Sequence, residues 1–319
     1  MHAPSNLIYW ALFLLLVAVM IVLDLVAMDS RKVRMRTALV WTAIWVLLTA
    51  AFAVALFFFG QRMAADTSRS NLQLSLEFIT AYVVEESLSL DNLFVFLLIF
   101  RYFKVPSEYQ HKVLLWGILG AIVTRGVFIG AGIALLNRFH WVIYLLGAFL
   151  LYAGIKLLLH RSERRPEQSW FARFAERHMR LTGDFGAGRF LVLRDGVRYL
   201  SRLALVLVVI EMTDVIFAVD SIPAVLAVTR QPFVAFTSNI FAVLGLRALF
   251  LTVSGLLDRF HLLHYGLATI LAFIGAKMLA ANWIEISTLW ALGIVALVLG
   301  VSMTLSIVIE PKKQSAVAE

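Results

Sequence analysis

Two apolar stretches of the sequence carry several carboxylates in their interiors. The first is Phe78 to Arg101 (FITAYVVEESLSLDNLFVFLLIFR) and the second is Leu203 to Arg230 (LALVLVVIEMTDVIFAVDSIPAVLAVTR). A carboxylate near the centre of a membrane-spanning helix costs roughly 2.5 to 3.5 kcal/mol, so several of them need a compensating role, and cation binding is the default. The candidate ligands are Glu85, Asp91, Glu211, Asp214 and Asp220.

Further oxygen-bearing side chains accompany these acids. An all-oxygen ligand set suits hard divalent ions such as Mn²⁺, Mg²⁺ and Ca²⁺, whereas Zn²⁺ and Cu⁺ favour His, Cys or Met ligands. The pattern therefore predicts a site for a hard divalent cation. The supporting polar residues are Asn92, Thr213, Ser221 and Asn239.

Two arginines, Arg125 and Arg247, stand in the middle of other apolar stretches. A buried guanidinium needs a partner, so we expect both to pair with carboxylates rather than to bind the ion. An alternative is that the acids serve only in such pairs and fix helix register. Five acids outnumber two arginines by three, which favours the ion site.

The composition places these stretches in a membrane. Hydrophobic residues make up 61% of the 319 residues and charged residues 15%, with a mean hydropathy of +0.89, far more apolar than a soluble domain requires. The net charge of +8 comes from basic residues in the connections, so nucleic-acid binding is not expected. The absence of cysteine excludes thiol redox chemistry and cysteine-based metal sites within this chain.

Nine apolar stretches are long enough to cross a bilayer, at about 20 residues each. Basic residues follow the first, third, fifth and ninth of them, all on one side if the stretches alternate. That side is cytoplasmic by the positive-inside rule, so we expect the N-terminus outside and the C-terminus inside. The first stretch lacks a basic n-region and a cleavage site, which predicts a retained helix. The stretches are 7–27, 38–59, 76–100, 113–136, 141–159, 203–228, 233–257, 262–281 and 286–308.

An internal repeat relates the two acidic stretches. The sequence LLNRFH at 135–140 reappears as LLDRFH at 256–261, an offset of 121, and 154–156 matches 275–277 at the same offset. Each repeat holds three apolar stretches, so the second copy enters the membrane from the opposite side. Inverted repeats with polar helices are typical of secondary transporters, whose ions bind near the midplane. With small gaps, the repeat pairs Glu85 with Asp214, Asp91-Asn92 with Asp220-Ser221, and Arg125 with Arg247.

The sequence thus predicts an all-α membrane protein of about nine transmembrane helices with two inverted three-helix repeats. Between the repeats, residues 170–181 have the spacing of an interfacial amphipathic helix, and Asp195-Gly196 predicts a hairpin turn. We favour a solvated linker with an interfacial anchor here over a regulatory domain. The expected division is two peripheral helices in 1–75, the first repeat in 76–159, the basic cytoplasmic loop in 160–202, the second repeat in 203–281 and a final helix with a cytoplasmic tail in 282–319.

Pro223 follows Asp220 within the second acidic stretch. Asp214 and Asp220 are six residues apart, about 120° around an ideal helix, so a straight helix does not make them converge. Proline removes a helical hydrogen bond and its ring clashes with the carbonyl four residues earlier, that of Val219. We therefore expect the helix to kink or unwind beside Asp220 and to free a carbonyl oxygen as a further ligand.

The segments EESLSLDNLFVF and EMTDVIFAVDSIPAVLAVTRQPFVAFTSNIFAVLGLRALF resemble the paired signatures of the TerC family of integral membrane proteins, and the whole chain resembles its Alx branch. The resemblance implies a manganese exporter of a bacterial cytoplasmic membrane, related to the LysE-type transporter superfamily. The family is also labelled for tellurium resistance and redox modulation. The family's acidic positions fall on Glu85, Asp91, Glu211, Asp214 and Asp220, while Glu86 lies outside its core site.

Three functions are compatible with this sequence. A secondary Mn²⁺ exporter, driven by proton entry, accounts for the repeats and the oxygen-rich site. A scaffold or metal-delivery partner for secreted proteins has no evident need for five buried acids. An intramembrane aspartyl protease needs only two facing aspartates, such as Asp91 and Asp220. We therefore expect a non-enzyme with Mn²⁺ as its transported ion, no permanently bound cofactor, the lipid bilayer as its surroundings, and a homo-oligomer as an open alternative.

Overall fold

The computed structural model describes residues 5–27, 35–139, 141–159, 182, 184–194, 197–253, 262–281, 283 and 286–308. Within this part of the chain, each of the nine predicted apolar stretches forms an α-helix, so the helical fold class is confirmed. The helices are α1 (Ser5–Ala27), α2 (Met35–Ala64), α3 (Asn71–Tyr102), α4 (Ser107–Arg138), α5 (Val142–Leu159), α7 (Arg202–Val228), α8 (Pro232–Val253), α9 (Leu263–Ala280) and α10 (Thr288–Val308).

Four helices are long and apolar enough to cross a membrane. Three further helical segments are apolar but shorter within the described residues, at Leu7–Leu23, Pro232–Leu246 and Tyr265–Ala280. The acid-bearing helices α3 and α7 belong to neither group, because charged side chains interrupt their apolar sequences. The four spans are Leu39–Ala64, Ser107–Arg138, Val142–Leu159 and Thr288–Ser306.

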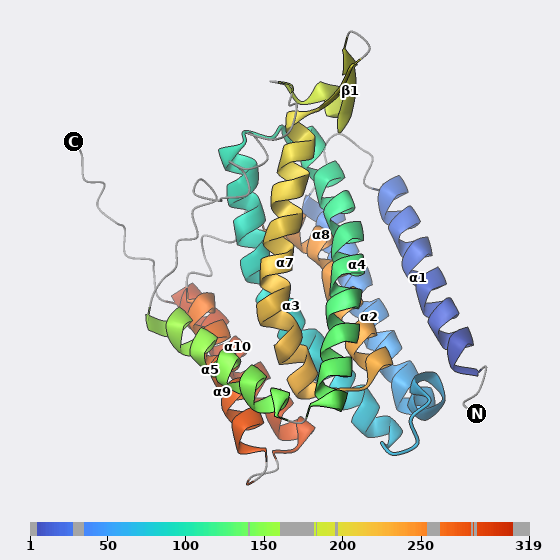
Figure 1. The fold of residues 1–319 in the computed structure, drawn as a ribbon, viewed down its shortest axis with the longest axis vertical. Helices are drawn as coiled ribbons and strands as arrows, with labels where there is room; N and C mark the ends of the chain where they lie inside the picture. The colour runs from blue at the N-terminus through green and yellow to red at the C-terminus, as the bar shows by residue number, and fades with distance from the viewer. Residues whose placement is uncertain are drawn as a thin grey trace.

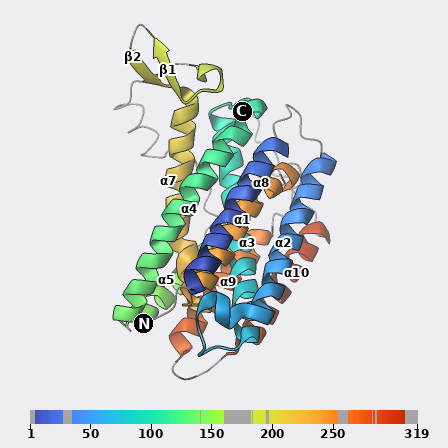
Figure 2. The ribbon, with the colours of Figure 1, turned by 90° about the vertical axis from the view of Figure 1, so that its right-hand side faces the viewer.

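Helices α3, α4, α7 and α8 form the centre of an elongated bundle (Figure 1). Helix α3 packs against both α7 and α8, and α4 packs against the same two helices. Helices α1 and α2 lie along one side of this centre, while α5, α9 and α10 gather on the other (Figures 1 and 2). The two acidic helices are therefore brought into contact in the interior, with α4 and α8 closing the space around them.

The helices α5 and α9 cross at very short range. A Cβ atom at Gly154 would lie 2.7 Å from the backbone oxygen of Ala268, and a Cβ atom at Gly275 would lie 2.7 Å from the backbone oxygen of Gly147. Real Cβ atoms essentially never come this close to a backbone atom. Glycine at both positions is therefore what lets the two helices touch through their backbones.

A small hairpin stands at one end of the bundle, before α7 (Figure 1). Its strands, β1 (Leu191–Arg194) and β2 (Val197–Leu200), pair antiparallel with Arg194 opposite Val197, so the predicted two-residue hairpin is confirmed. The Lys112 ammonium on α4 donates to the Gly188 carbonyl at 2.7 Å and ties the preceding loop to the bundle. Helix α1 begins at the opposite end (Figures 1 and 2). The amphipathic helix predicted over 170–181 lies outside the described residues.

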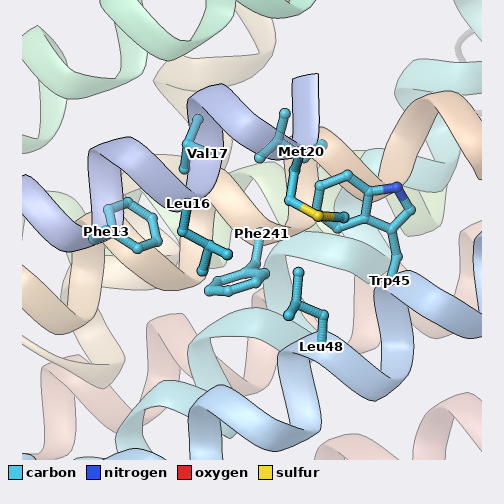
Figure 3. Close-up of a pocket in the computed structure, with 8 residues that line it drawn as sticks. Phe13, Leu16, Val17, Met20, Trp45, Leu48 and Phe241 are labelled. Carbon is cyan, nitrogen blue, oxygen red and sulfur yellow. The ribbon is translucent and has the colours of Figure 1, made fainter. Parts of the chain in front are cut away.

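An apolar niche lies between α1, α2 and α8, away from the acids (Figure 3). Figure 3 shows Phe13 and Met20 of α1 facing Trp45 of α2 and Phe241 of α8 across it. The niche is too narrow for a water molecule and presents no oxygen ligand. It is a packing contact that holds α1 on the bundle rather than a site for an ion.

Candidate functional site

Arg125, in the middle of α4, lies at the centre of the buried polar residues. Its side chain is 1% exposed, and its guanidinium contacts acids from both acidic helices. Nη2 donates to Asp214 Oδ1 at 2.9 Å, Nε donates to Asp214 Oδ2 at 3.3 Å, and Nη1 donates to Glu85 Oε1. Nη1 also lies 3.3 Å from Asn239 Oδ1 on α8. One guanidinium thus links α3, α4, α7 and α8, and the expected pairing of Arg125 with carboxylates is observed.

The pairing explains how these charges remain buried. Glu85 is fully buried and Asp214 is 7% exposed, so each needs a counter-charge close by. The planar guanidinium supplies several donors at fixed angles, which suits two carboxylates on opposite sides. Two negative charges nevertheless face one positive charge, so the group of three keeps a net charge of −1.

Several buried polar atoms of α3, α7 and α8 have no hydrogen-bond partner within the described residues. Natural proteins satisfy most buried polar atoms, so unsatisfied ones call for an explanation. Three of them belong to α3, one belongs to α8, and one belongs to α7, two turns beyond Asp214. The atoms are Glu85 Oε2, Glu86 Oε2, Ser89 Oγ, Ser221 Oγ and Asn239 Nδ2. Four of the five carry an oxygen that can bind a hard cation.

A small cavity of about 20 Å³ lies next to the Arg125–Asp214 pair. That volume is about enough for one water molecule. Apart from Arg125 and Asp214 its lining is apolar, and it includes Gly117 and Ala121 on the two turns of α4 before Arg125. The cavity therefore extends from the ion pair towards the end of the bundle that carries the hairpin.

Glu211 lies one turn before Asp214 on α7 and is half-buried. Its carboxylate lies against the backbone of α4 at Gly120, where any Cβ atom would clash with it. No hydrogen bond or ion pair holds this carboxylate among the described residues. Glu211 is thus an acid at the α4–α7 crossing, near Asp214 but separate from the Arg125 pair.

The remaining predicted site residues divide into four groups. Asn92, Ser221 and Asn239 are buried, as a supporting role requires. Thr213 instead donates to the Val209 carbonyl at 2.6 Å within its own helix. Asp220 is partly buried on α7. The side chains of Asp91 and Arg247 lie outside the described part of the structure.

The predicted acids whose side chains are described, Glu85, Glu211, Asp214 and Asp220, do not enclose a common point. Within the described residues, no three acidic or histidine side chains come close enough together to hold a metal ion. The reason is that Arg125 stands between Glu85 and Asp214, while the Glu211 carboxylate lies one turn away, against α4 at Gly120. The geometry is that of an acidic site occupied by a guanidinium.

The expected break of α7 at Pro223 is wrong in its stronger form. Helix α7 runs unbroken from Arg202 to Val228, with Pro223 inside it. Proline deprives only the Val219 carbonyl of its helical partner, and the flanking residues Ile222 and Ala224 are buried against neighbouring helices. Tertiary packing therefore keeps the helix wound without the missing bond.

Glu86 lies outside the core site that the sequence predicts, but the structure places it close to that site. Its Oε2 atom is buried without a hydrogen-bond partner, beside the unpartnered Oε2 atom of Glu85. Its carboxylate faces α8 at Gly245, where a Cβ atom would lie 3.6 Å from Oε1. The sequence feature that could have indicated a role for Glu86 is its position as a second acid, next to Glu85, inside an apolar stretch.

A second polar cluster ties α3 to the end of α7 away from the hairpin. Glu77 is 9% exposed and accepts a hydrogen bond from Thr229 Oγ1 at 2.5 Å. Arg69, in the connection before α3, places Nε 3.2 Å from Glu77 Oε1. Gln231 donates to the Ala64 carbonyl at 2.6 Å beside it. These bonds hold this end of the bundle together, whereas the cavity lies on the other side of Arg125.

Comparison with known proteins gives a family for the chain. The family model described as "Integral membrane protein TerC family" matches residues 70–314. A protein of Photorhabdus laumondii named as a membrane-bound redox modulator, Alx, is 41% identical over 311 residues, covering 96% of this chain and 97% of its own length. The Escherichia coli K12 protein of the same name is 40% identical over 303 residues, with 92% of each chain covered.

An uncharacterized membrane protein of Myxococcus xanthus, STKORF319, is also 40% identical over 303 residues, covering 94% of this chain and 92% of its own length. No solved structure matches the chain. The family model covers more than half of the chain, and its relatives align over nearly all of it. The protein therefore belongs to the TerC family of integral membrane proteins.

Proposed function

We propose that this protein is a secondary transporter that exports Mn²⁺ across a bacterial cytoplasmic membrane, through a carboxylate site between α3 and α7. Glu85 and Asp214 are the central ligands of the proposed site. Asp91, Glu211 and Asp220 supply further carboxylates along the path.

The observation that carries the proposal is the excess of buried acid around Arg125. The carboxylates of Glu85, Glu86 and Asp214 lie in the interior of the bundle. Among the described residues, Arg125 is the basic side chain that contacts Glu85 and Asp214. Buried acids without matching cations are costly in a membrane and are retained where they serve ion or proton pathways. The unpartnered carboxylate oxygens of Glu85 and Glu86, neighbours on α3, match the ligand preference of Mn²⁺.

The internal repeat gives a second line of support. Gly154 and Gly275 are 121 residues apart, and so are Gly147 and Ala268, the residues whose carbonyls they approach. Each contact therefore has its equivalent in the other repeat, as a pseudo-twofold axis between α5 and α9 requires. Glu85 and Asp214 are also equivalent in the two repeats, and both contact Arg125. Inverted repeats with a site at their interface are the architecture of many secondary transporters.

Orientation follows from charge. The connection before α7 carries ten arginines between positions 161 and 202, and its described hairpin stands at one end of the bundle. The positive-inside rule places that end in the cytoplasm and the beginning of α1 outside. The cavity beside Arg125 then lies on the cytoplasmic side of the ion pair, the side from which an exported ion arrives.

The names of the relatives suggest redox modulation as a second function. This chain has no cysteine, so it cannot carry out thiol exchange itself. A scaffold for a redox partner would not require acids in the interior of the bundle. Cation transport explains these residues, and any redox effect would then be indirect.

The experiment is a comparison of two variants on the same helix in cells lacking their own Mn²⁺ exporters. Asp214→Asn removes one central charge and keeps the side-chain shape, so protection from manganese should be lost while the protein remains in the membrane. Thr213→Val removes a hydroxyl that bonds within its own helix, and should protect like the wild type. Full protection by Asp214→Asn, with accumulated Mn²⁺ at the wild-type level, would contradict the proposed site.

A further inference from the structure

We propose that Arg125 is a built-in competitor of the transported ion. Its guanidinium holds Glu85 and Asp214 in the structure described here, and it leaves them when a divalent cation binds. The inference rests on the proposed ion site and adds a mechanism to it, the exchange of a side-chain cation for the transported cation.

The contacts of Asp214 carry the first step. Both of its oxygens are engaged by the same guanidinium, Oδ1 by Nη2 and Oδ2 by Nε. A hard divalent ion binds carboxylate oxygens directly, at roughly 2.0 to 2.6 Å. The ion and the guanidinium would therefore occupy the same position, so binding at Asp214 requires Arg125 to release at least one oxygen.

Charge carries the second step. With Arg125 in place, the two carboxylates that it contacts and the arginine sum to −1, so a divalent ion bound to the same two carboxylates would leave a local excess of +1. If the guanidinium moves away, the ion and the two carboxylates sum to zero, and Glu86 remains as a further acid beside Glu85. Charges interact more strongly in a protein interior than in water, so repulsion between the ion and a guanidinium on the same carboxylates favours the exchange.

The surroundings of Arg125 provide the direction of its movement. Long side chains on a helix point towards the helix N-terminus, and on α4 that direction leads over Ala121 and Gly117 into the cavity. Glu211, whose carboxylate lies against α4 at Gly120, is an acid at this level without a described partner. The cavity holds about one water molecule, so the guanidinium enters it only if α4 and α7 shift. Ion binding would thereby be coupled to helix movement.

The test measures Mn²⁺ affinity by calorimetry at pH 7.5 on the purified full-length protein and its Arg125→Gln variant. Removing a competitor that frees the site in only about 1 to 10% of molecules should raise the apparent affinity about 10- to 100-fold. Arg125→Lys keeps the charge with fewer hydrogen bonds, so its affinity should fall between the two. Arg125→Gln should also be less stable than the wild type without Mn²⁺ and recover when Mn²⁺ is added.

Equal or weaker Mn²⁺ binding by Arg125→Gln and Arg125→Lys, with the wild type binding normally, would overturn the exchange and leave the ion site standing. Absence of binding by every protein would refute the ion site itself. If Arg125→Gln does not fold, the double variant Glu85→Gln/Arg125→Gln removes one charge of each sign and is compared with Glu85→Gln alone. The exchange requires tighter binding by the double variant, and equal affinity of the two would overturn it.

Discussion

Replacement of Gly154 by alanine tests the contact that relates the two repeats. The new methyl group would lie 2.5 Å from the Ala272 backbone nitrogen and 2.7 Å from the Ala268 carbonyl oxygen, whereas ordinary contact begins at 3.4 Å. Relief of the closest contact requires helices α5 and α9 to separate by about 0.9 Å, the difference between 3.4 Å and 2.5 Å. The obstacle is backbone, which cannot rotate away as a side chain could.

The expected cost is that of overpacking, about 1 to 3 kcal/mol in the free energy of unfolding. The control is Gly130→Ala on α4, where nothing lies within 4 Å of the new Cβ atom. Alanine is favoured over glycine in a helix by about 1 kcal/mol, so the control should be neutral or stabilising. The measurement is unfolding of the purified protein by titration with SDS, followed by tryptophan fluorescence.

The internal repeat predicts that equivalent substitutions on the two sides of this contact have similar effects on stability. Gly275→Ala should cost about as much as Gly154→Ala, because the approach to the Gly147 oxygen is also 2.7 Å. The double variant should cost less than the sum, since one separation of the helices accommodates both methyl groups. Clearly unequal single costs, or strictly additive ones, would refute the account of this crossing.

Two further variants address the site. Pro223→Ala restores a helical hydrogen bond within an already continuous helix, so thermal stability should stay level or rise. Mn²⁺ affinity should change less than twofold. A large loss of Mn²⁺ affinity would show that the proline shapes the ion site. Glu86→Gln removes a buried charge beside Glu85 and should weaken Mn²⁺ binding on the order of tenfold in calorimetry. Unchanged affinity in the folded Glu86→Gln protein would remove this residue from the site.

Much of the fold could be predicted from the sequence, because membrane-spanning helices are recognisable as long apolar segments. Each apolar stretch became a helix, although the helices extend beyond the predicted limits where polar residues continue them, as at both ends of α2. Asp195-Gly196 is a typical hairpin turn pair, and the strands on either side of it pair as this pattern predicts.

The site was less predictable, because its geometry depends on side chains from four helices. Spacing along α3 and α7 identifies the acids, but it does not reveal that Arg125 contacts one acid on each of these helices. The proline pattern predicts a break that is not observed, since packing around Ile222 and Ala224 keeps α7 wound. The family resemblance does not include Glu86, whose burial depends on the contact of α3 with α8.

The most direct test of the account is Mn²⁺ uptake into liposomes that contain only the purified protein. Wild-type protein should move Mn²⁺ across the bilayer down an imposed gradient, and the Asp214→Asn variant, reconstituted at equal density and shown to be folded, should not. Equal Mn²⁺ flux through the two proteins, or no flux through the wild type in either direction and under any imposed proton gradient, would contradict the central claim that the buried carboxylates form a transport site.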